Sequence, residues 1–300
     1  MNYEESLEYL LNLDVFGWHP GLERIEQLMA ALGNPEREMK FVHIGGTNGK
    51  GSTTAMTVSV LQEAGYKTGM FISPHLYDYR ERIQIGQQWI PEEDLARITT
   101  VIRERIGEML NKGLEHPTGF EVSTALALMY FHEQKVDIAV MEVGLGGAID
   151  STNVIIPLVS VITNVTMDHM EYLGNTIREI ASVKAGIIKR GVPVVTAAEE
   201  PDALEEISGR ALAQESDLYQ VGRDLYYNVL ELDERGTRFR VKDSEGWSLE
   251  LFTPLVGAHQ AINGTTVALI IRLLNGQGFK ISDEVLQQGL RRSFWPARLE

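Results

Sequence analysis

The segment from His43 to Thr54, HIGGTNGKGSTT, has the glycines, the lysine and the hydroxyl groups of a phosphate-binding loop. It follows the short apolar run 40–44, which predicts a strand, and it precedes AMTVSVLQEAG, whose apolar residues have helical spacing. A strand, a glycine-rich turn and a helix in this order aim backbone N–H groups and a helix N-terminus at an anion. The stretch therefore predicts phosphate binding.

The spacing within this segment departs from the strict P-loop pattern. That pattern requires glycine at the position of Ile44, and here Gly51 also follows the lysine. In the variant G-T-N-G-K-G-S, Lys50 would reach the outer phosphates, and Ser52 or Thr53 could offer a hydroxyl to Mg²⁺. A glycine-rich turn alone could be only a tight turn, so the prediction depends on the lysine, the hydroxyls and the flanking elements together.

Polar side chains also follow three further predicted strands. One strand ends at Ser73, a second carries Glu142 just before the glycines of GLGG, and a third is followed by Asn164 and then Asp168 and His169. Ligands of parallel sheets bind beyond the carboxyl ends of the strands. Carboxylate, hydroxyl and imidazole groups at neighbouring strand ends could therefore hold Mg²⁺ beside a triphosphate.

Each of these side chains also has a structural interpretation. Glu142 could be a buried acid whose carboxylate accepts hydrogen bonds from backbone amides. His169 could cap the turn before Tyr172, and Ser73 could simply begin a turn before Pro74. These alternatives stay open at the level of single residues.

Three further positions have two interpretations. Lys184 lies among apolar residues in IASVKAGII, and a buried lysine must be paired, neutral or modified, although a surface stripe is the alternative. His259 could be structural. Arg80 and Arg82 could form a solvated charge pair.

Composition excludes several classes of protein. With 300 residues, of which 44% are hydrophobic and 23% charged, the chain can form one large domain or two small ones. A net charge of −15 argues against nucleic acid as a partner. The absence of cysteine excludes disulfides, a thiol nucleophile and cysteine-bound zinc. The N-terminus lacks the basic and apolar regions of a signal peptide, and no apolar run has the length of a membrane span. We expect a soluble, cytoplasmic monomer that acts on small molecules and not at a membrane.

Strands and helices alternate along most of the chain, which predicts right-handed crossovers and an α/β fold: a mostly parallel sheet with helices on both faces and the phosphate loop at its edge. The predicted strands are Lys40–Ile44, Lys67–Ile72, Asp137–Val143, Leu158–Thr163 and Val192–Ala197. Besides the helix after the phosphate loop, the predicted helices are Tyr3–Leu13, Gly21–Leu32, Pro91–Leu110, Gly119–Gln134, Thr176–Ile188, Gln260–Leu274 and Ser282–Arg292.

The pattern changes between Leu218 and Val256. There RFRVKD and SLELF alternate with period two around Gly236 and Gly246. This alternation predicts a small antiparallel β section of about residues 218–256, made of hairpins appended to the main sheet.

Eight motifs occur in order along the chain: HIGGTNGKGS, SPHL followed by ERI, TGFE, EVGLGG-x-x-D-S-T-N, ITN-x-x-x-DH, LG-x-T-I-x-x-IA-x-x-KAGI, HQ-x-x-N and WPARLE. Together they resemble the bacterial folylpolyglutamate synthases and dihydrofolate synthases, which belong to the Mur ligase superfamily. The resemblance runs from the first helices to residue 300, with Ala297 where glycine is usual and IGG where many relatives differ. Other Mur ligases share the phosphate loop, but not SPHL with ERI or WPARLE.

The resemblance implies an ATP-dependent ligase that forms carbon–nitrogen bonds. In this family a substrate carboxylate attacks the γ-phosphate of ATP, which gives an acyl phosphate and ADP. The amine of L-glutamate then displaces phosphate. The acceptor is (tetrahydro)folate, dihydropteroate or both.

The resemblance also implies roles for individual residues. Lys50, Lys184 and His169 would be catalytic, with Lys184 matching the lysine that the family carbamylates with CO₂. ATP would contact Thr47, Asn48, Gly49, Lys50, Gly51, Ser52 and Thr53 through its phosphates, Asn263 through adenine, and Arg298 through the phosphates. Two Mg²⁺ ions would be held by Ser52, Ser73, Glu142 and His169. The loop 75–82 would help to hold the pterin, with Pro74, His75 and Arg82 binding substrate.

Full-length members of the family continue after WPARLE into a smaller Rossmann-like domain. We therefore expect residues 1–296 to form the Mur-ligase-type ATP-binding domain and 297–300 to begin the linker to a C-terminal domain that this chain lacks. Two alternatives follow: a nucleotide- and folate-binding domain without turnover, and another Mur-type ligase that acts on a cell-wall or polymer precursor. SPHL with ERI disfavours the second alternative.

Overall fold

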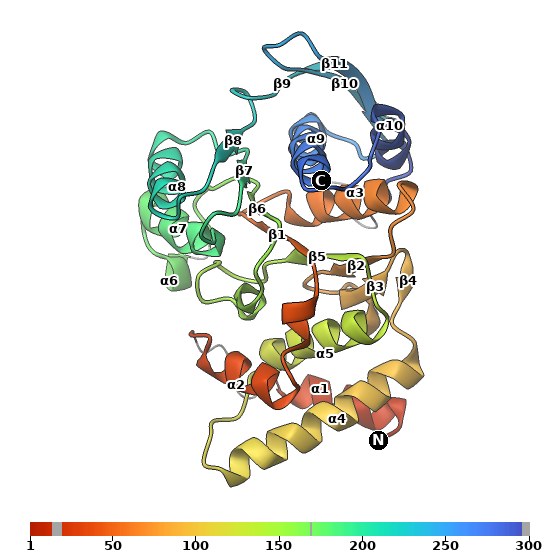
Figure 1. Ribbon diagram of the computed structural model, residues 1–300, viewed down its shortest axis with the longest axis vertical. Coiled ribbons are helices and arrows are strands. Elements are labelled where there is room, and N and C mark those ends of the chain that lie inside the picture. Colours follow the sequence, from red (N-terminus) through yellow and green to blue (C-terminus); the bar gives the residue numbers. More distant parts are fainter. Residues whose placement is uncertain (14–19, 169, 296–300) are drawn as a thin grey trace.

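A computed structural model describes residues 1–13, 20–168 and 170–295 of the chain (Figure 1). Its centre is an eight-stranded sheet of order β4-β3-β2-β5-β1-β6-β7-β8. The strands are β1 (Phe41–Gly45), β2 (Thr68–Phe71), β3 (Ile83–Ile85), β4 (Gln88–Trp89), β5 (Ile138–Glu142), β6 (Val159–Ile162), β7 (Val194–Thr196) and β8 (Leu218–Gln220). The pairs β2–β3 and β3–β4 are antiparallel, and the other neighbouring pairs are parallel. The predicted mostly parallel sheet is confirmed, and the β3–β4 edge hairpin is an addition to it.

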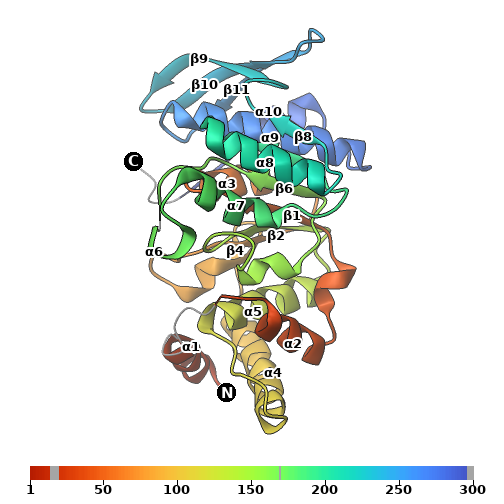
Figure 2. The same cartoon turned by 90° about the vertical axis from the view of Figure 1, so that its left-hand side faces the viewer.

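Helices cover both faces of this sheet. They are α1 (Tyr3–Asn12), α2 (Glu23–Ala31), α3 (Lys50–Glu63), α4 (Glu92–Asn111), α5 (Gly119–Glu133), α6 (Met170–Leu173), α7 (Ile177–Lys184), α8 (Pro201–Ala213), α9 (His259–Gly276) and α10 (Asp283–Arg291). Short 3₁₀ turns span Pro35–Glu38, Tyr79–Arg82, Ser151–Val154 and Ala185–Ile187. In Figures 1 and 2, α1, α2, α4 and α5 lie on one side of the sheet, and α3, α9 and α10 lie on the other.

Successive side chains of a strand point to opposite faces of the sheet, so each central strand contributes to a hydrophobic cluster on both faces. In β1, Val42 and Ile44 join the cluster on the α3 and α9 side, whereas Phe41 joins the cluster with α4 and α5. In β5, Val140 and Met141 divide in the same way. Because both faces of the sheet are covered, its central strands are continuously apolar in sequence.

The antiparallel section differs from the prediction in its start and its attachment. Leu218–Gln220 pairs in parallel with β7 and belongs to the main sheet. The antiparallel strands β9 (Tyr226–Asp233), β10 (Gly236–Lys242) and β11 (Ser248–Thr253) form a separate sheet. Phe239 and Val241 of β10 join the core formed with α9, so this sheet packs on helices and is not appended to the main sheet (Figure 2).

Two helical segments also depart from the prediction. The predicted helix Thr176–Ile188 divides into α7, which ends at Lys184, and the 3₁₀ turn that follows. Helix α8 has no counterpart among the predicted elements, although Pro201 at its first position is a typical helix-start signal. Among the described residues, no helix combines the length and apolarity needed to cross a bilayer.

Candidate nucleotide and substrate site

Strand order brings the predicted polar strand ends to one edge of the sheet. β2, β5, β1 and β6 are neighbours, and their registers pair Ile44 with Glu142 and Gly45 with Ile162. Ser73 follows β2, the phosphate loop follows β1, and Asn164 follows β6. The convergence predicted from sequence is therefore confirmed for these segments.

The loop between β1 and α3 requires its glycines. Gly46 and Gly49 have φ angles of +134° and +84°, which disfavour residues with a side chain. A Cβ on Gly46 would lie 2.0 Å from Thr163 Oγ1, and one on Gly49 would lie 2.6 Å from Asn263 Oδ1. The second contact places Asn263 of α9 directly beside the loop. The family resemblance implied that Asn263 and the loop residues contact the same nucleotide.

Hydrogen bonds fasten this loop to the segment after β6. Thr163 Oγ1 donates to the Asn48 carbonyl at 2.7 Å, and Asn48 N donates to Asn164 Oδ1 at 2.8 Å. Thr47 N donates to the Asn164 carbonyl at 2.9 Å. These hydrogen bonds fix the conformation of the loop, and the first turn of α3 follows it directly.

Two lysine side chains meet at one carbonyl of the loop. Lys50 Nζ donates to the carbonyls of Gly46 at 3.2 Å and Thr47 at 3.0 Å. Lys184 Nζ donates to the same Gly46 carbonyl at 2.9 Å. The backbone N–H groups of the first turn of α3 lack partners within the helix. The loop therefore combines two amines with the positive end of a helix, which suits a polyanion.

Lys184 is buried, with 3% of its surface exposed, so the surface-stripe interpretation is wrong. The pKa of the Lys184 amine is lowered from 10.5 to about 8, chiefly by burial. The charge of Lys50 contributes to this lowering, and Asp168 opposes both effects. A substantial fraction of the amine is consequently neutral just above neutral pH.

Glu142 ends β5 and has 2% of its surface exposed, which excludes a solvated role. The glycine turn after it is held by Asp150, which accepts hydrogen bonds from Leu145 N at 2.8 Å and Thr152 N at 2.9 Å. Burial raises the pKa of the Asp150 carboxyl, and these donors oppose the rise. Asp150 has no predicted role, although it begins the motif D-S-T-N.

Asp150 also belongs to a buried chain of polar groups. Thr152 Oγ1 donates to Asp150 Oδ1 and lies 2.8 Å from His43 Nε2 in the middle of β1. Burial, with a contribution from Lys189, lowers the pKa of His43 to about 3, so its imidazole is neutral. The chain links the strand before the phosphate loop to the turn after Glu142.

A cavity of about 480 Å³ opens beside the phosphate loop. We call it the loop cavity; its lining includes Asn48, Gly49, Ser52, Thr163, Asn164, Glu199, Glu200, His259, Gln260 and Asn263. Asn263 Nδ2 donates to Gln260 Oε1 at 2.9 Å, and Gln260 Nε2 lies 3.0 Å from His259 Nε2. The three polar residues of HQ-x-x-N thus form one hydrogen-bonded row along the cavity.

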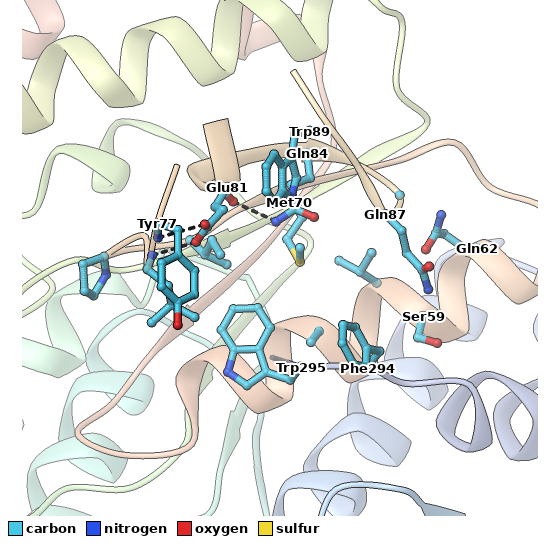
Figure 3. A pocket seen from close by; sticks show the side chains of 16 residues that line it. Ser59, Gln62, Met70, Tyr77, Glu81, Gln84, Gln87, Trp89, Phe294 and Trp295 are labelled. Atoms are coloured by element: carbon cyan, nitrogen blue, oxygen red, sulfur yellow. Dashed lines mark hydrogen bonds between the residues drawn. The ribbon is translucent and has the colours of Figure 1, made fainter. Parts of the chain in front are cut away.

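A second cavity, of about 470 Å³, lies alongside α3 (Figure 3). We call it the aromatic pocket; its lining includes Ala55, Val58, Ser59, Gln62, Met70, Ile72, Pro74, Leu76, Tyr77, Glu81, Gln84, Gln87, Trp89, Phe294 and Trp295. Trp295 packs against the first turn of α3, where a Cβ on Gly51 would lie 2.7 Å from its Cζ2. The pocket combines aromatic walls with glutamine amides, which suits a flat, polar-edged ring.

The segment 73–82 places the predicted substrate residues near this pocket. Pro74 lines it, while Arg82 Nε donates to His75 Nδ1 at 2.8 Å. Arg80 pairs with Asp78 at 2.6 Å and with Glu92 of α4 at 3.0 Å. Arg80 and Arg82 therefore have specific partners within the fold. The interpretation of the two residues as a solvated charge pair is wrong. His75 and Arg82 are not among the residues that line the pocket.

The structure describes only some of the remaining predicted site residues. His169 and Arg298 lie outside the described residues. Within the ranges that the structure describes, no cluster of three or more His, Asp or Glu side chains could hold a metal. The hydroxyls of Ser52 and Ser73 and the carboxylate of Glu142 are nevertheless oxygen donors of the kind that Mg²⁺ prefers.

Comparisons with known proteins agree with this geometry. The family model described as the Mur ligase middle domain matches residues 44–271. The dihydrofolate synthase/folylpolyglutamate synthase of Bacillus subtilis is 41% identical over 300 residues, which cover 99% of this chain and 70% of that protein. The folylpolyglutamate synthase of Lacticaseibacillus casei is 38% identical over 302 residues, which cover 100% of this chain and 71% of that protein.

Solved structures are similar over the whole chain. An FPGS complex with AMPPCP and folate superposes with a TM-score of 0.93 at 37% identity, covering 100% of this chain and 74% of that one. Escherichia coli FolC in complex with DHPP and ADP superposes with a TM-score of 0.86 at 31% identity, covering 100% of this chain and 68% of that one.

Proposed function

This chain belongs to the Mur ligase family, among the folylpolyglutamate and dihydrofolate synthases, and we propose that it is an ATP-dependent ligase that adds L-glutamate to a folate or to dihydropteroate. The observation that supports this proposal most is the position of α3. Its N-terminal turn carries the phosphate loop and its side lines the aromatic pocket. A nucleotide at the N-terminus of this helix and a ring-bearing substrate along its flank can therefore lie close to each other.

The loop cavity is the proposed nucleotide site. The similar structures that hold AMPPCP or ADP support this assignment. The β- and γ-phosphates would bind at residues 46–53, where Lys50 and the α3 N-terminus neutralise charge. Adenine would lie along the row of His259, Gln260 and Asn263. Arg298 would contact the phosphates.

The oxygen donors at the strand ends fit Mg²⁺. Ser52, Ser73, Glu142 and His169 would hold two Mg²⁺ ions, which neutralise phosphate charge when bound. Glu142 supports this assignment because it is buried at the carboxyl end of β5, beside the strand that leads into the phosphate loop.

Lys184 is the proposed site of a carbamate. The neutral amine nitrogen would attack the carbon of CO₂, forming an N–C bond and releasing one proton to solvent. The product carries a negative charge and two oxygens in place of an ammonium. Burial and a pKa of about 8 support the reaction, because the amine must be deprotonated to attack.

The aromatic pocket is the proposed site of the folate or dihydropteroate ring. In the reaction, a carboxylate oxygen of this substrate attacks the γ-phosphorus, and ADP leaves with the electrons of the broken P–O bond. The amine of L-glutamate then attacks the acyl carbon; phosphate leaves and a proton passes to solvent. Lys50 would stabilise the charge that develops on the phosphoryl group.

Glutamate-dependent ADP formation tests this function. The 300-residue chain is given Mg·ATP and L-glutamate with 7,8-dihydropteroate, and separately with tetrahydrofolate. Product with dihydropteroate establishes dihydrofolate synthase activity, and product only with tetrahydrofolate establishes polyglutamylation. Lys50→Ala should abolish either signal. Tight binding of both ligands without turnover would instead support a nucleotide- and folate-binding domain, the second candidate.

A further inference from the structure

Glu81 holds three consecutive backbone amides at the edge of the aromatic pocket. Its Oε2 accepts from Leu76 N at 2.6 Å, and its Oε1 accepts from Tyr77 N at 3.0 Å (Figure 3). Oε1 also accepts from Asp78 N at 2.8 Å. Glu81 is only 8% exposed. Burial by itself would raise the pKa of this carboxyl, but the three amides and His75 hold the pKa below its ordinary value. The group therefore binds the loop as a carboxylate.

The residues that Glu81 holds are large and exposed. Leu76 is 51% exposed and Tyr77 is 92% exposed, and both line the aromatic pocket. A tyrosine side chain with so little protein around it contributes little to folding through its ring. Its backbone is nevertheless fixed by a buried carboxylate. The loop thus has a rigid backbone that presents apolar side chains to the pocket mouth.

Other contacts make this arrangement part of the pocket wall. The backbone carbonyl of Glu81 accepts from Gln84 Nε2 at 2.7 Å, and Gln84 also lines the pocket. Asp78 accepts from Arg80 N at 2.9 Å, and the Arg80 guanidinium lies 5.7 Å from the ring centre of Trp89. Glu81 therefore links the loop at the pocket mouth to Gln84 in the pocket wall. Asp78 links the same loop to Arg80, which lies beside Trp89.

We propose that Glu81 is a positioning residue for the ring-bearing substrate: by fixing the backbone of 76–78, it sets Leu76 and Tyr77 over the aromatic pocket so that they close on the bound ring. The inference rests on the proposed function, because it requires a folate-type ligand in this pocket. The carboxylate acts through Leu76 and Tyr77 and takes no part in nucleotide binding.

The isosteric variant Glu81→Gln isolates this role. Both carboxylate oxygens accept hydrogen bonds from backbone N–H groups, so the amide of glutamine must turn its NH₂ toward at least one of them in either orientation. One or more buried N–H groups then lose their acceptor. The change alters neither the size of the side chain nor any residue of the phosphate loop. Glu93→Gln, on the exposed first turn of α4, makes the same charge change as a control.

The experiment measures two affinities and one local rate. Folate is titrated by tryptophan fluorescence, AMPPCP by calorimetry, and amide hydrogen exchange is followed in peptides that cover 73–82. Glu81→Gln should bind folate roughly tenfold more weakly than wild type. Its AMPPCP affinity should be unchanged, and its 76–78 amides should exchange faster. Glu93→Gln should match wild type in all three.

Three outcomes would overturn the inference in different ways. Equal folate affinity of Glu81→Gln and wild type refutes the positioning role alone. A parallel loss of folate and AMPPCP affinity shows that Glu81 only stabilises the fold. Failure of the wild type to bind both folate and 7,8-dihydropteroate refutes the substrate assignment of the proposed function. If Glu81→Gln does not fold, Tyr77→Ala takes its place, since removing a side chain that is 92% exposed should weaken folate binding without unfolding the chain.

Discussion

Gly49→Ala tests whether the loop between β1 and α3 binds nucleotide in the shape described. Gly49 has a φ of +84°, and an alanine in this left-handed region is strained by roughly 1 kcal/mol. Its Cβ would also lie 2.6 Å from Asn263 Oδ1, closer than real Cβ contacts. Asn263 would have to move and weaken its hydrogen bond to Gln260, which adds about 1 kcal/mol. If the backbone strain and the weakened hydrogen bond both destabilise the loop conformation that binds nucleotide, AMPPCP affinity falls by roughly 30-fold.

Gly65→Ala is the matched control for this prediction. Gly65 has a φ of +87° just after α3, and a Cβ added there would meet nothing within 4 Å. It should carry the backbone strain alone, about 1 kcal/mol in the free energy of unfolding, with unchanged AMPPCP affinity. Calorimetric titration and urea unfolding of both variants separate the two terms. Wild-type AMPPCP affinity in Gly49→Ala would refute the assignment of this loop to the nucleotide.

Three more predictions concern the same region. Lys50→Ala should weaken AMPPCP binding at least tenfold by calorimetry, because an ammonium near phosphate is lost; equal affinity contradicts the assignment. The depressed pKa of Lys184 means that the unfolded chain binds more protons than the folded chain between pH 8 and 10.5. In CO₂-free buffer, wild-type stability should therefore rise across that window by about 3 kcal/mol relative to Lys184→Met, and parallel urea-unfolding curves would contradict this. Gly51→Ala should displace Trp295, changing tryptophan emission and weakening folate binding; an unchanged spectrum would count against the contact.

Local signals were enough to predict the edge of the sheet where the candidate site lies. An apolar run, a glycine-rich turn and a helical period occur within one short stretch around Lys50, and each signal depends only on neighbouring residues. The polar residues after β2, β5 and β6 could be assigned to the same edge because parallel strands end together. The apolar neighbours of Lys184 indicated burial in the same local way, although they left a surface stripe open until the packing around α7 was known.

Features that depend on tertiary contacts could not be predicted in this way. Leu218–Gln220 has the alternation of the hairpins that follow it, and only its pairing with β7 places it in the main sheet. The contacts of Gly49 with Asn263 and of Gly51 with Trp295 join segments far apart in the chain. Both glycines carry a motif signal, but the side chains that make them necessary appear only in the folded structure.

The position of α3 also explains how one helix could serve both of the proposed ligands. Its first turn forms the phosphate loop, while Ala55, Val58 and neighbouring residues line the aromatic pocket. Helix α10 also packs closely against α3: a Cβ on Gly289 would lie 2.5 Å from the Cα of Val60, and Ser59 Oγ donates to the Gly289 carbonyl at 2.6 Å. A helix clamped in this way fixes the distance between the two cavities. The proposed acyl-phosphate formation needs two reactants held at one separation, and a helix shared by the two sites would supply that separation.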